Sequence, residues 1–589
     1  MGGIVGRLFH EFAATLVAAI AISLVISLTV TPTMCAYVLT STRDEKHGRV
    51  YRMSEKAFDF LLSGYRRSLA WALRHPAIIF SLFLATFVLN GVLLVRVPKG
   101  FFPIQDTGTI MGGFQGPQDA SFQSMRSSLI EIEKVIQTDP AVSVVSGFTG
   151  GQGGPGGGSI NSGFLFVILK PLSERKVSAA DVLNRLRPKL NALPGASTYL
   201  QPAQDLTVGG RQSNAAYQYQ ISSDTVEDLS TWGPKLYEQM RHMPSLRDVT
   251  TDQQDRGLQM LLEYDRTTSA RLGITPRMIN NSLYYEFGES QVSTIYSPIN
   301  QYYVILSAAP QFLDNPASLN STFVHASGSG SVPLSAIAHT KASTSPLAVN
   351  HSSFFPSVTI AFNLAPGVAL GQATADIQRL QQKMGMPSSI RGQFAGTAEA
   401  FQKSVSSEPF LILGALLAIY IVLGILYESL IHPITILTTL PSASVGAFLS
   451  LIVFHSEFDV ISFIGIILLV GIVKKNAIMM IDFALQAERE QGMSTRDSIF
   501  EASLLRFRPI LMTTFAAILG ALPLAFGRGT GAELRHPLGI AVVGGLVFSQ
   551  ILTLYSTPVI YLYFDRIAQK FKRDTSNVQL TQEPGNATA

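Results

Sequence analysis

The 589-residue sequence is poor in cysteine and in charged residues, and each shortage excludes a class of protein. Cys35 is the only cysteine, so intrachain disulfides and zinc sites built from several thiolates are excluded. Charged residues make up 14% of the chain and hydrophobic residues 47%, whereas soluble domains carry about a quarter charged residues. The net charge of +4 is small for this length and gives no reason to expect a nucleic-acid partner. The composition therefore indicates a membrane protein with a soluble part.

Motifs of nucleotide-driven transport and of catalysis are also missing. No G-x-x-x-x-G-K-[ST] sequence occurs, and the glycine-rich segment 147–163 lacks the Lys-Ser/Thr pair of a phosphate-binding loop. We interpret that segment as a mobile loop between strands. No nucleophile–base pair, metal cluster or cofactor motif is recognised, so neither an enzyme nor a cofactor is predicted. If the protein transports a substrate, an ion gradient is the expected energy source.

Seven apolar runs are long enough to cross a bilayer, which takes about 20 residues. They cover residues 12–39, 77–96, 409–428, 433–454, 460–486, 509–527 and 538–564. The segment 43–74 holds eight basic and four acidic residues, so the positive-inside rule places it in the cytoplasm. Six further crossings bring the basic tail to the same side, and residues 97–408 are then expected on the far side.

Within the basic segment, apolar residues recur at helical spacing. They are Phe58, Leu61, Leu62, Tyr65, Leu69 and Leu73. This stripe predicts an amphipathic helix that lies along the membrane surface. The alternative, a solvated linker, does not explain the stripe.

The long segment between the second and third runs has the pattern of soluble α+β domains. Predicted strands at 109–114, 142–149 and 163–169 alternate with helices at 120–137 and 179–192. This is the β-α-β, β-α-β order of a split ferredoxin-like unit. A second round is predicted at 217–222, 225–243, 248–251, 357–363, 370–384 and 390–394. An inserted subdomain at 259–347 interrupts the second round.

The run 461–485, ISFIGIILLVGIVKKNAIMMIDFAL, places charged side chains inside a membrane-spanning helix. Each lysine at such a depth costs at least ~2.5–3.5 kcal/mol, and charges of this kind usually serve ion movement. Lys475 and Asp482 lie seven residues apart and therefore share a helix face. Lys474 lies about 100° round the helix, and we interpret it as structural.

The next helix carries a second pair at the same spacing, Arg506 and Thr513. Arg506 is either part of a polar pathway or an anchor at the membrane interface. Thr513 is either functional or bonded to its own helix. A proton relay also needs a titrating carboxylate, and Asp482 is the only one deep in any run. The relay is therefore expected to be incomplete within this sequence.

Several motifs closely resemble the C-terminal half of resistance–nodulation–division (RND) efflux pumps of the inner membrane. They are GIVKKNAIMMIDFA, LYESLIHPITILTTLPSASVGA, LLRFRPILMTTFAAILGALPLAFG, LTLYSTPVIYLYFDR, PKGFFPIQDTG and the first 39 residues. Within the family the chain is most similar to the Mdt-type multidrug subunits that form mixed trimers. AEREQGMS, GAELRHPLGI and QPAQDLTVGGRQ are closest to the B subunit of that pair. The span that carries paired aspartates in the family has no counterpart here, so a C-terminal half is expected.

The resemblance implies an α-helical transmembrane bundle of about seven spans, with a large α+β periplasmic region of ferredoxin-like porter subdomains and a docking subdomain. The expected domains are a transmembrane helix at 1–42, a cytoplasmic amphipathic linker at 43–76, a transmembrane helix at 77–96, a first porter subdomain at 97–213, a second porter subdomain at 214–258 and 348–402, a docking subdomain at 259–347, a five-helix transmembrane region at 403–566 and a polar cytoplasmic tail at 567–589.

The resemblance also assigns roles to single residues. Lys475, Thr513 and Arg506 match the lysine, threonine and arginine of the family's proton relay, and Asp482 matches an acidic position just below. Phe148 and Phe166 fall on two aromatic positions of the family's drug pocket, and Tyr199 lies near a third. The glycine-rich segment takes the place of the family's switch loop.

The implied function is that of a subunit of a multidrug exporter driven by the proton-motive force, without a cofactor. The expected protein is a multi-pass protein of the bacterial inner membrane with a cytoplasmic C-terminus. Its expected partners are homologous subunits in a trimer of one or two kinds of chain, a periplasmic adaptor, an outer-membrane channel, membrane lipid and amphiphilic drugs. One alternative is a non-transporting half that only assembles with an N-terminal half. Another is a heavy-metal exporter, although Met479, Met480 and Met512 are more typical of core packing.

Overall fold

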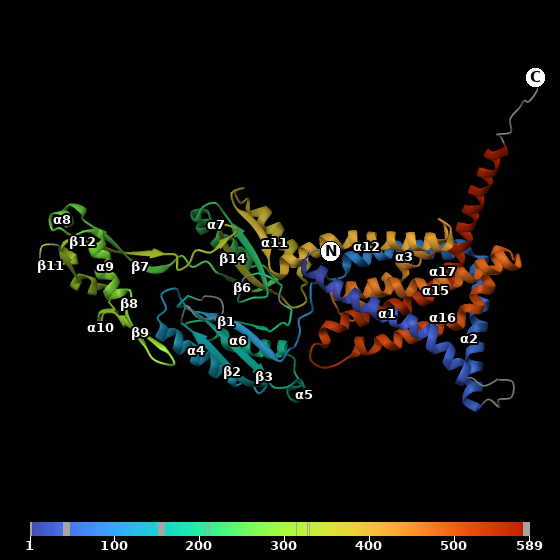
Figure 1. The fold of residues 1–589 in the computed structure, drawn as a ribbon, viewed down its shortest axis with the longest axis horizontal. Helices are drawn as coiled ribbons and strands as arrows, with labels where there is room; N and C mark the ends of the chain where they lie inside the picture. The colour runs from blue at the N-terminus through green and yellow to red at the C-terminus, as the bar shows by residue number, and fades with distance from the viewer. Residues whose placement is uncertain are drawn as a thin grey trace, which may run out of the picture.

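The computed structural model describes an elongated molecule with three regions along its length (Figure 1). A helical bundle forms one end, two α/β units lie in the middle, and an inserted subdomain forms the far end. The described residues are 3–38, 48–150, 159–206, 208–210, 213–313, 315–326, 328 and 330–580, with side chains omitted for 3–5, 50 and 567–580. Most of the glycine-rich loop, 151–158, lies outside the described residues, so its predicted mobility stays a prediction.

Among the described residues, seven helical stretches are long and apolar enough to cross a membrane. The helices are α1 (Gly3–Val38), α3 (Pro76–Arg96), α12 (Thr397–Tyr427), α13 (His432–Leu437) with α14 (Leu440–Val453), α15 (Val460–Gln491), α16 (Thr495–Phe526) and α17 (Ala532–Leu580). Each coincides with one predicted run. Helices α12 and α16 begin more than ten residues before their runs, because a hydropathy pattern marks only the apolar part of a helix that continues into a polar region.

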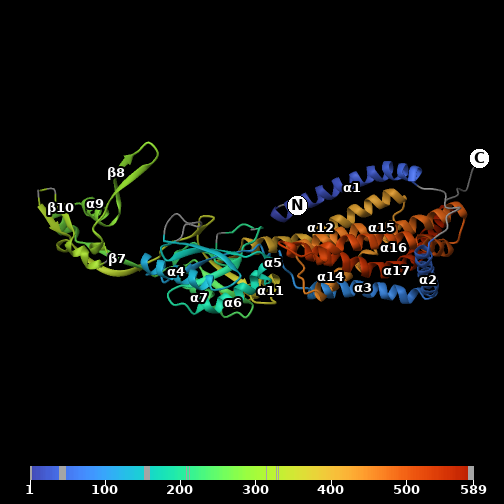
Figure 2. The ribbon, with the colours of Figure 1, turned by 90° about the horizontal axis from the view of Figure 1, so that it is seen from below.

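Helix α17 packs against α14, α15 and α16 and forms the centre of the bundle. Glycines allow its closest approach: a Cβ added to Gly446 of α14 would lie 2.6 Å from the carbonyl oxygen of Gly544 of α17. Small residues at such crossings are typical of helix packing in membranes. Helix α1 lies at the edge of the bundle (Figure 2). Its Phe9 ring packs edge-on against that of Phe463 at 5.7 Å. Nearly all other side chains described in α1 are exposed.

The predicted amphipathic helix is confirmed as α2 (Arg49–Arg74), but its apolar stripe packs against protein. Tyr65, Leu69 and Leu73 are buried in one cluster with residues of α16 and α17. The Tyr65 ring stacks on Phe507 at 4.5 Å, and its hydroxyl donates a hydrogen bond to the carbonyl of Leu554 at 2.9 Å. Helical spacing indicates a buried face without identifying what covers it, and the predicted position of this helix along the membrane surface stays a prediction.

The first α/β unit has the predicted β-α-β, β-α-β order. Its elements are β1 (Thr109–Gln115), α4 (Phe122–Gln137), β2 (Val142–Thr149), β3 (Ser162–Leu169), the short α5 (Leu172–Arg175), α6 (Ala179–Asn191) and β4 (Ser197–Pro202). The strands form an antiparallel sheet in the order β2-β3-β1-β4. Alternate residues of β3, Leu165 and Val167, point to the face that α4 and α6 cover.

The second α/β unit repeats this topology around an insertion. It contains β5 (Tyr217–Ser222), α7 (Val226–Arg241), β6 (Leu246–Thr251), β13 (His351–Ser352), β14 (Phe355–Leu364), α11 (Leu370–Met384) and β15 (Arg391–Ala395). The sheet runs β15-β5-β14-β6. The inserted subdomain contains β7 (Gly257–Tyr264), α8 (Arg266–Arg271), α9 (Pro276–Phe287), β8 (Ser290–Tyr296), β9 (Gln301–Leu306), α10 (Pro310–Leu313), β10 (Phe323–Ala326), β11 (Gly330–Pro333) and β12 (Ala338–Ser345). Strands β7 and β12 pair with each other and join the subdomain to the unit.

The two α/β units are attached to the bundle in different ways. The core of the second unit continues into the bundle through Phe101, Phe401 and Phe458, which belong to the same buried cluster as α15 residues such as Phe463. The first unit has a separate buried cluster of its own. Because apolar packing holds domains more firmly than scattered polar contacts, we expect the second unit to be joined to the bundle more firmly than the first unit.

Candidate functional site

Two of the charged residues predicted for a proton relay lie on an open face of the bundle. Lys475 and Asp482, two helical turns apart on α15, are both exposed. Within the described part of the chain no carboxylate forms an ion pair with Lys475. A lysine side chain that faces lipid without a partner is costly, so this face requires a polar cover.

The two predicted residues of α16 are less exposed. The guanidinium of Arg506 lies over the ring of Phe483 at 4.7 Å, and its Nε is buried without a hydrogen-bond partner in the structure. The hydroxyl of Thr513 donates to the carbonyl of Ile510 at 3.1 Å, which is a bond within its own helix. The structure therefore places these residues in the bundle beside α15, and no hydrogen bond joins either of them to Lys475 among the described residues.

A polar cluster that the sequence analysis missed joins three helices next to this face. Asn476 of α15 donates through Nδ2 to the hydroxyl of Thr514 at 3.2 Å and to Oε1 of Gln550 at 3.3 Å. The Thr514 hydroxyl in turn donates to the same Gln550 oxygen at 2.7 Å. Asn476 and Thr514 each follow a predicted residue directly in the sequence. The signal available in the sequence was the presence of an amide or hydroxyl inside each of three apolar runs.

The three residues predicted to bind substrate share one face of the first sheet. The strand register places Phe148 opposite Phe164 and Phe164 opposite Gly113, which in turn lies opposite Tyr199. Phe166 lies two residues along β3 and points to the same side. Its ring is 6.4 Å from that of Phe148 in an edge-on arrangement. This is the face that α4 and α6 leave uncovered.

The register also identifies two residues of this face that were not predicted. Phe164 lies in the centre of the row, with its ring 4.8 Å from that of Phe166, and Met111 lies opposite Phe166 on β1. Gly113 makes room for the Asn214 side chain between Phe164 and Tyr199, because a Cβ there would lie 2.4 Å from the Asn214 side-chain oxygen. The period of two along β3 was the signal that would have grouped Phe164 with Phe166.

Polar side chains join the first unit to the second. Arg187 of α6 forms an ion pair with Asp248 of β6 at 2.9 Å, and Asn363 of β14 donates to the same carboxylate at 3.1 Å. Asp248 adopts a left-handed backbone conformation, with a φ of 49°. We call this contact between the first and second units the seam. Near it, burial raises the pKa of the Tyr199 hydroxyl above its ordinary value. The seam thus has an ionic contact in place of a shared apolar core.

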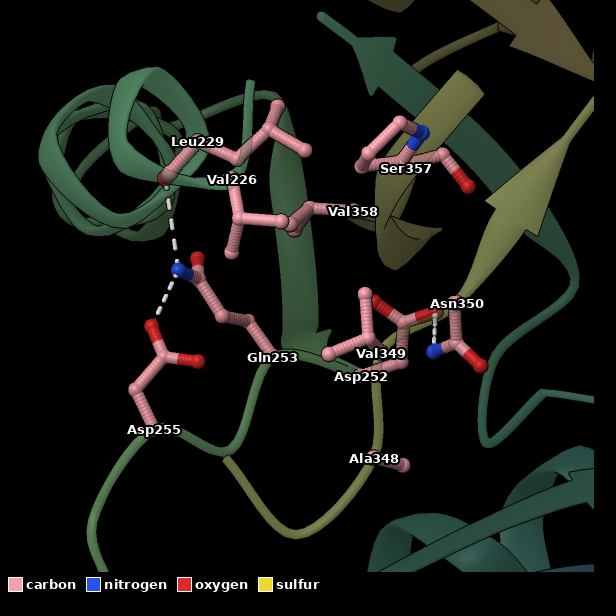
Figure 3. A pocket seen from close by; sticks show the side chains of 11 residues that line it. Val226, Leu229, Asp252, Gln253, Asp255, Ala348, Val349, Asn350, Ser357 and Val358 are labelled. Atoms are coloured by element: carbon pink, nitrogen blue, oxygen red, sulfur yellow. Dashed lines mark hydrogen bonds between the residues drawn. The ribbon is translucent and has the colours of Figure 1, made fainter. Parts of the chain in front are cut away.

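A small cavity lies where the inserted subdomain joins the second unit (Figure 3). Its volume of about 30 Å³ is far below that of drug-binding pockets, which measure roughly 300–1,000 Å³. Figure 3 shows the Gln253 carboxamide between the Leu229 carbonyl and the Asp255 carboxylate, and Asp252 facing Asn350. These bonds tie the two connecting segments, which precede β7 and follow β12, to each other and to α7, so the cavity belongs to a structural junction.

Gln254, which lies between Gln253 and Asp255 in this junction, contacts the first unit. Nδ2 of Asn161, a buried residue beside the glycine-rich loop, donates to Oε1 of Gln254 at 2.8 Å. The Arg256 backbone N–H donates to the Gln118 side chain. The first unit therefore contacts both the second sheet and the connection to the inserted subdomain through polar groups.

We expect the Arg187–Asp248 pair to contribute to closure of the seam. In a double-mutant cycle, Arg187→Ala and Asp248→Ala should show a coupling energy of roughly 0.5–3 kcal/mol, because both side chains are partly buried and share one bond. Hydrogen exchange of the β6 amides in the full chain would measure it. Arg379→Ala, which removes an exposed pair on α11, is the matched control. Additive effects of the two seam substitutions would contradict this role.

The comparisons with known proteins agree with this arrangement of helices and sheets. Residues 1–565 match the model of the AcrB/AcrD/AcrF family. Multidrug resistance protein MdtC of Yersinia enterocolitica is 52% identical over 573 residues, which cover 97% of this chain and 55% of the relative. MdtC of Cronobacter sakazakii is 52% identical over 574 residues with the same coverage. The chain thus spans about half the length of these relatives and corresponds to their C-terminal half.

These relatives are named for the C subunit, so the predicted similarity to a B subunit is not specifically supported. The predicted family, the helical membrane region and the β-rich region are confirmed, and the family is one of transporters rather than enzymes. The chain belongs to the AcrB/AcrD/AcrF family of RND transporters, which are multi-pass proteins of the inner membrane.

Proposed function

We propose that this chain is a subunit of a proton-driven exporter of amphiphilic drugs, in which the bundle handles protons and the α/β units handle the substrate. The open charged face of α15 carries this proposal. Lys475 and Asp482 are exposed, whereas most of the exposed side chains of the spanning helices are apolar. Such a face needs polar groups from outside the residues that the structure describes.

The proposed partner of Lys475 is a carboxylate that binds and releases a proton. When it is ionised, attraction to the ammonium group favours a close approach of the two side chains, and protonation removes that attraction. The exchange would move α15 relative to the covering helices. Because the core of the second α/β unit is continuous with the bundle, such a movement would reach the α/β region through Phe401 and Phe458. The energy source is the proton-motive force.

The proposed substrate site is the aromatic face of the first sheet. Phe148 is 56% exposed although it is large and apolar, and Phe164, Phe166 and Tyr199 lie on the same side. Aromatic rings offer broad apolar contacts, and the Tyr199 hydroxyl adds a polar group, which suits amphiphilic molecules. The loosely attached first unit would open and close this face against its surroundings.

The proposed orientation places the α/β region in the periplasm and the C-terminus in the cytoplasm. In this orientation the inserted subdomain is farthest from the membrane, where it would meet an outer-membrane channel and a periplasmic adaptor. Its β8–β9 hairpin exposes large apolar side chains, among them Ile299 at 99%, Tyr296 and Tyr302. Such exposed side chains are typical of surfaces that contact other chains. Homologous subunits would complete a trimer.

Expression in a bacterial strain without its own RND pumps would test the proposal. The chain would be produced alone and together with the N-terminal part of an MdtC relative, and export of a fluorescent amphiphilic dye would be measured. We expect export only from the combination, and no export when the carboxylates of the N-terminal part are replaced by amides. Export by the chain alone would contradict our account of the relay. Copurification of the two parts without export would instead support the second candidate, a half that assembles but does not transport.

A further inference from the structure

The polar cluster of Asn476, Thr514 and Gln550 connects α15, α16 and α17 inside the bundle. Asn476 is 7% exposed and Thr514 is 4% exposed, so their side chains are withdrawn from lipid and from the open face. All three bonds are between side chains of different helices. Most other hydroxyl bonds in these helices, such as that of Thr553 to the Ser549 carbonyl at 2.7 Å, stay within one helix. The cluster is therefore an interhelical connection rather than local back-bonding.

Helix geometry fixes the angle between the side chains of the cluster and those of the open face. Consecutive residues of a helix point about 100° apart. Because Asn476 points into the bundle, the preceding Lys475 is turned toward the exposed side. Thr514 and Thr513 have the same relation on α16. Rotation of either helix about its axis would carry both members of a pair with it, so bonds that hold Asn476 and Thr514 also set the directions of Lys475 and Thr513.

One atom of the cluster has no partner. Oε1 of Gln550 accepts two hydrogen bonds, whereas its Nε2 is buried and makes none. An unsatisfied donor in a low-dielectric interior is costly, so Gln550 stabilises the bundle less than a fully paired amide would. The amide is thus better explained by what it orients than by what it adds to stability.

We propose that Asn476, Thr514 and Gln550 are positioning residues. They form a clamp that fixes the rotation of α15 and α16 so that Lys475 and Thr513 face the side from which the proton-binding partner approaches. This inference rests on the proposed function for the role of Lys475. The clamp itself is a property of these three helices and is measurable without transport.

The first test measures rotation of α15 in membranes that contain the full chain. In a Cys35→Ser background, Lys475→Cys is labelled with a small thiol reagent, alone and combined with Thr514→Val or Gln550→Met. Loss of one interhelical bond should lower the labelling rate at position 475 about threefold or more. Thr514→Ser, which keeps the hydroxyl, should restore the rate. Thr553→Val, which removes a buried hydroxyl bonded within its own helix, is the control and should leave the rate unchanged.

The second test uses the transporter assembled with the N-terminal part. With Lys475 present, Thr514→Val should shift the pH midpoint of dye export by about half a unit, because a displaced ammonium changes its attraction to the partner carboxylate. A merely structural role would lower the amount of protein without moving the midpoint. Labelling rates for Thr514→Val and Gln550→Met equal to that of the Thr553→Val control would overturn the clamp. If instead the labelling changes while Lys475→Met leaves export intact, the clamp stands and the proposed relay fails.

Discussion

Replacing Lys475 by methionine in the assembled transporter is expected to reduce dye export at least about a hundredfold, because groups that take part directly in proton transfer typically contribute that much. Methionine keeps an unbranched apolar stem close in length to that of lysine and removes the charged ammonium group. The partner carboxylate would then lose the cation that attracts it when it is ionised and not when it is protonated, so its protonation would no longer move the helices. Export from cells energised with glucose, measured at equal protein level in the membrane, would give the effect.

Lys474 provides a matched control for this experiment. It is adjacent, carries the same charge and is half-buried on a different face of α15. Lys474→Met should therefore reduce export far less than Lys475→Met. Equal losses in the two variants would point to a general effect of charge in α15, and intact export with Lys475→Met would remove the basis of the proposed mechanism.

Asp106→Ala should destabilise the first α/β unit by ~3–5 kcal/mol, the usual cost of leaving one member of a buried ion pair alone. Arg175 forms this pair with Asp106 at 2.5 Å, and the Arg175 side chain is only 1% exposed. The same carboxylate accepts backbone bonds from Ala179 at 2.8 Å and Gly108 at 3.1 Å. Hydrogen exchange of β1 and β3 amides in the full chain would report the loss. Because the first unit has its own buried cluster, the second unit should keep its protection.

An exposed carboxylate of the same unit, Asp119, serves as the control, and Asp119→Ala should change stability by no more than about 0.5 kcal/mol. Asp106 also predicts a dependence on pH. Burial by itself would raise the pKa of its carboxyl, but the bonds from Arg175, Ala179 and Gly108 outweigh burial and hold that pKa below its ordinary value. A lowered pKa in the folded state means that the stabilisation is complete above the unfolded pKa of about 4 and is lost as the pH falls below it.

Asp106→Asn should therefore remove the part of this acid sensitivity that involves the first unit. Wild-type protection of the β1 amides should fall as the pH drops below about 4, and the variant should be less stable than wild type at neutral pH but change less with acid. An identical acid response in both proteins would show that other groups govern it.

The sequence by itself determined the membrane-spanning helices, the two ferredoxin-like units and their insertion, because these depend on local periodicity and on the order of elements. It also determined that Lys475 and Asp482 share a helix face, since spacing along one helix is enough to decide that. It did not determine what lies against a face. The stripe of Tyr65, Leu69 and Leu73 predicted an amphipathic helix, and only the structure shows that the stripe packs on α16 and α17.

Only the tertiary structure decided which residues from distant segments meet. Asn476, Thr514 and Gln550 lie on three helices, and a hydrogen bond between helices depends on their rotation, which no single run of sequence contains. The row from Phe148 to Tyr199 likewise depends on strand register, since a shift of one residue would turn each side chain to the helix-covered face. The position of each helix and strand follows from local periodicity in the chain, whereas which of their faces contact each other is decided by the packing of all the elements together.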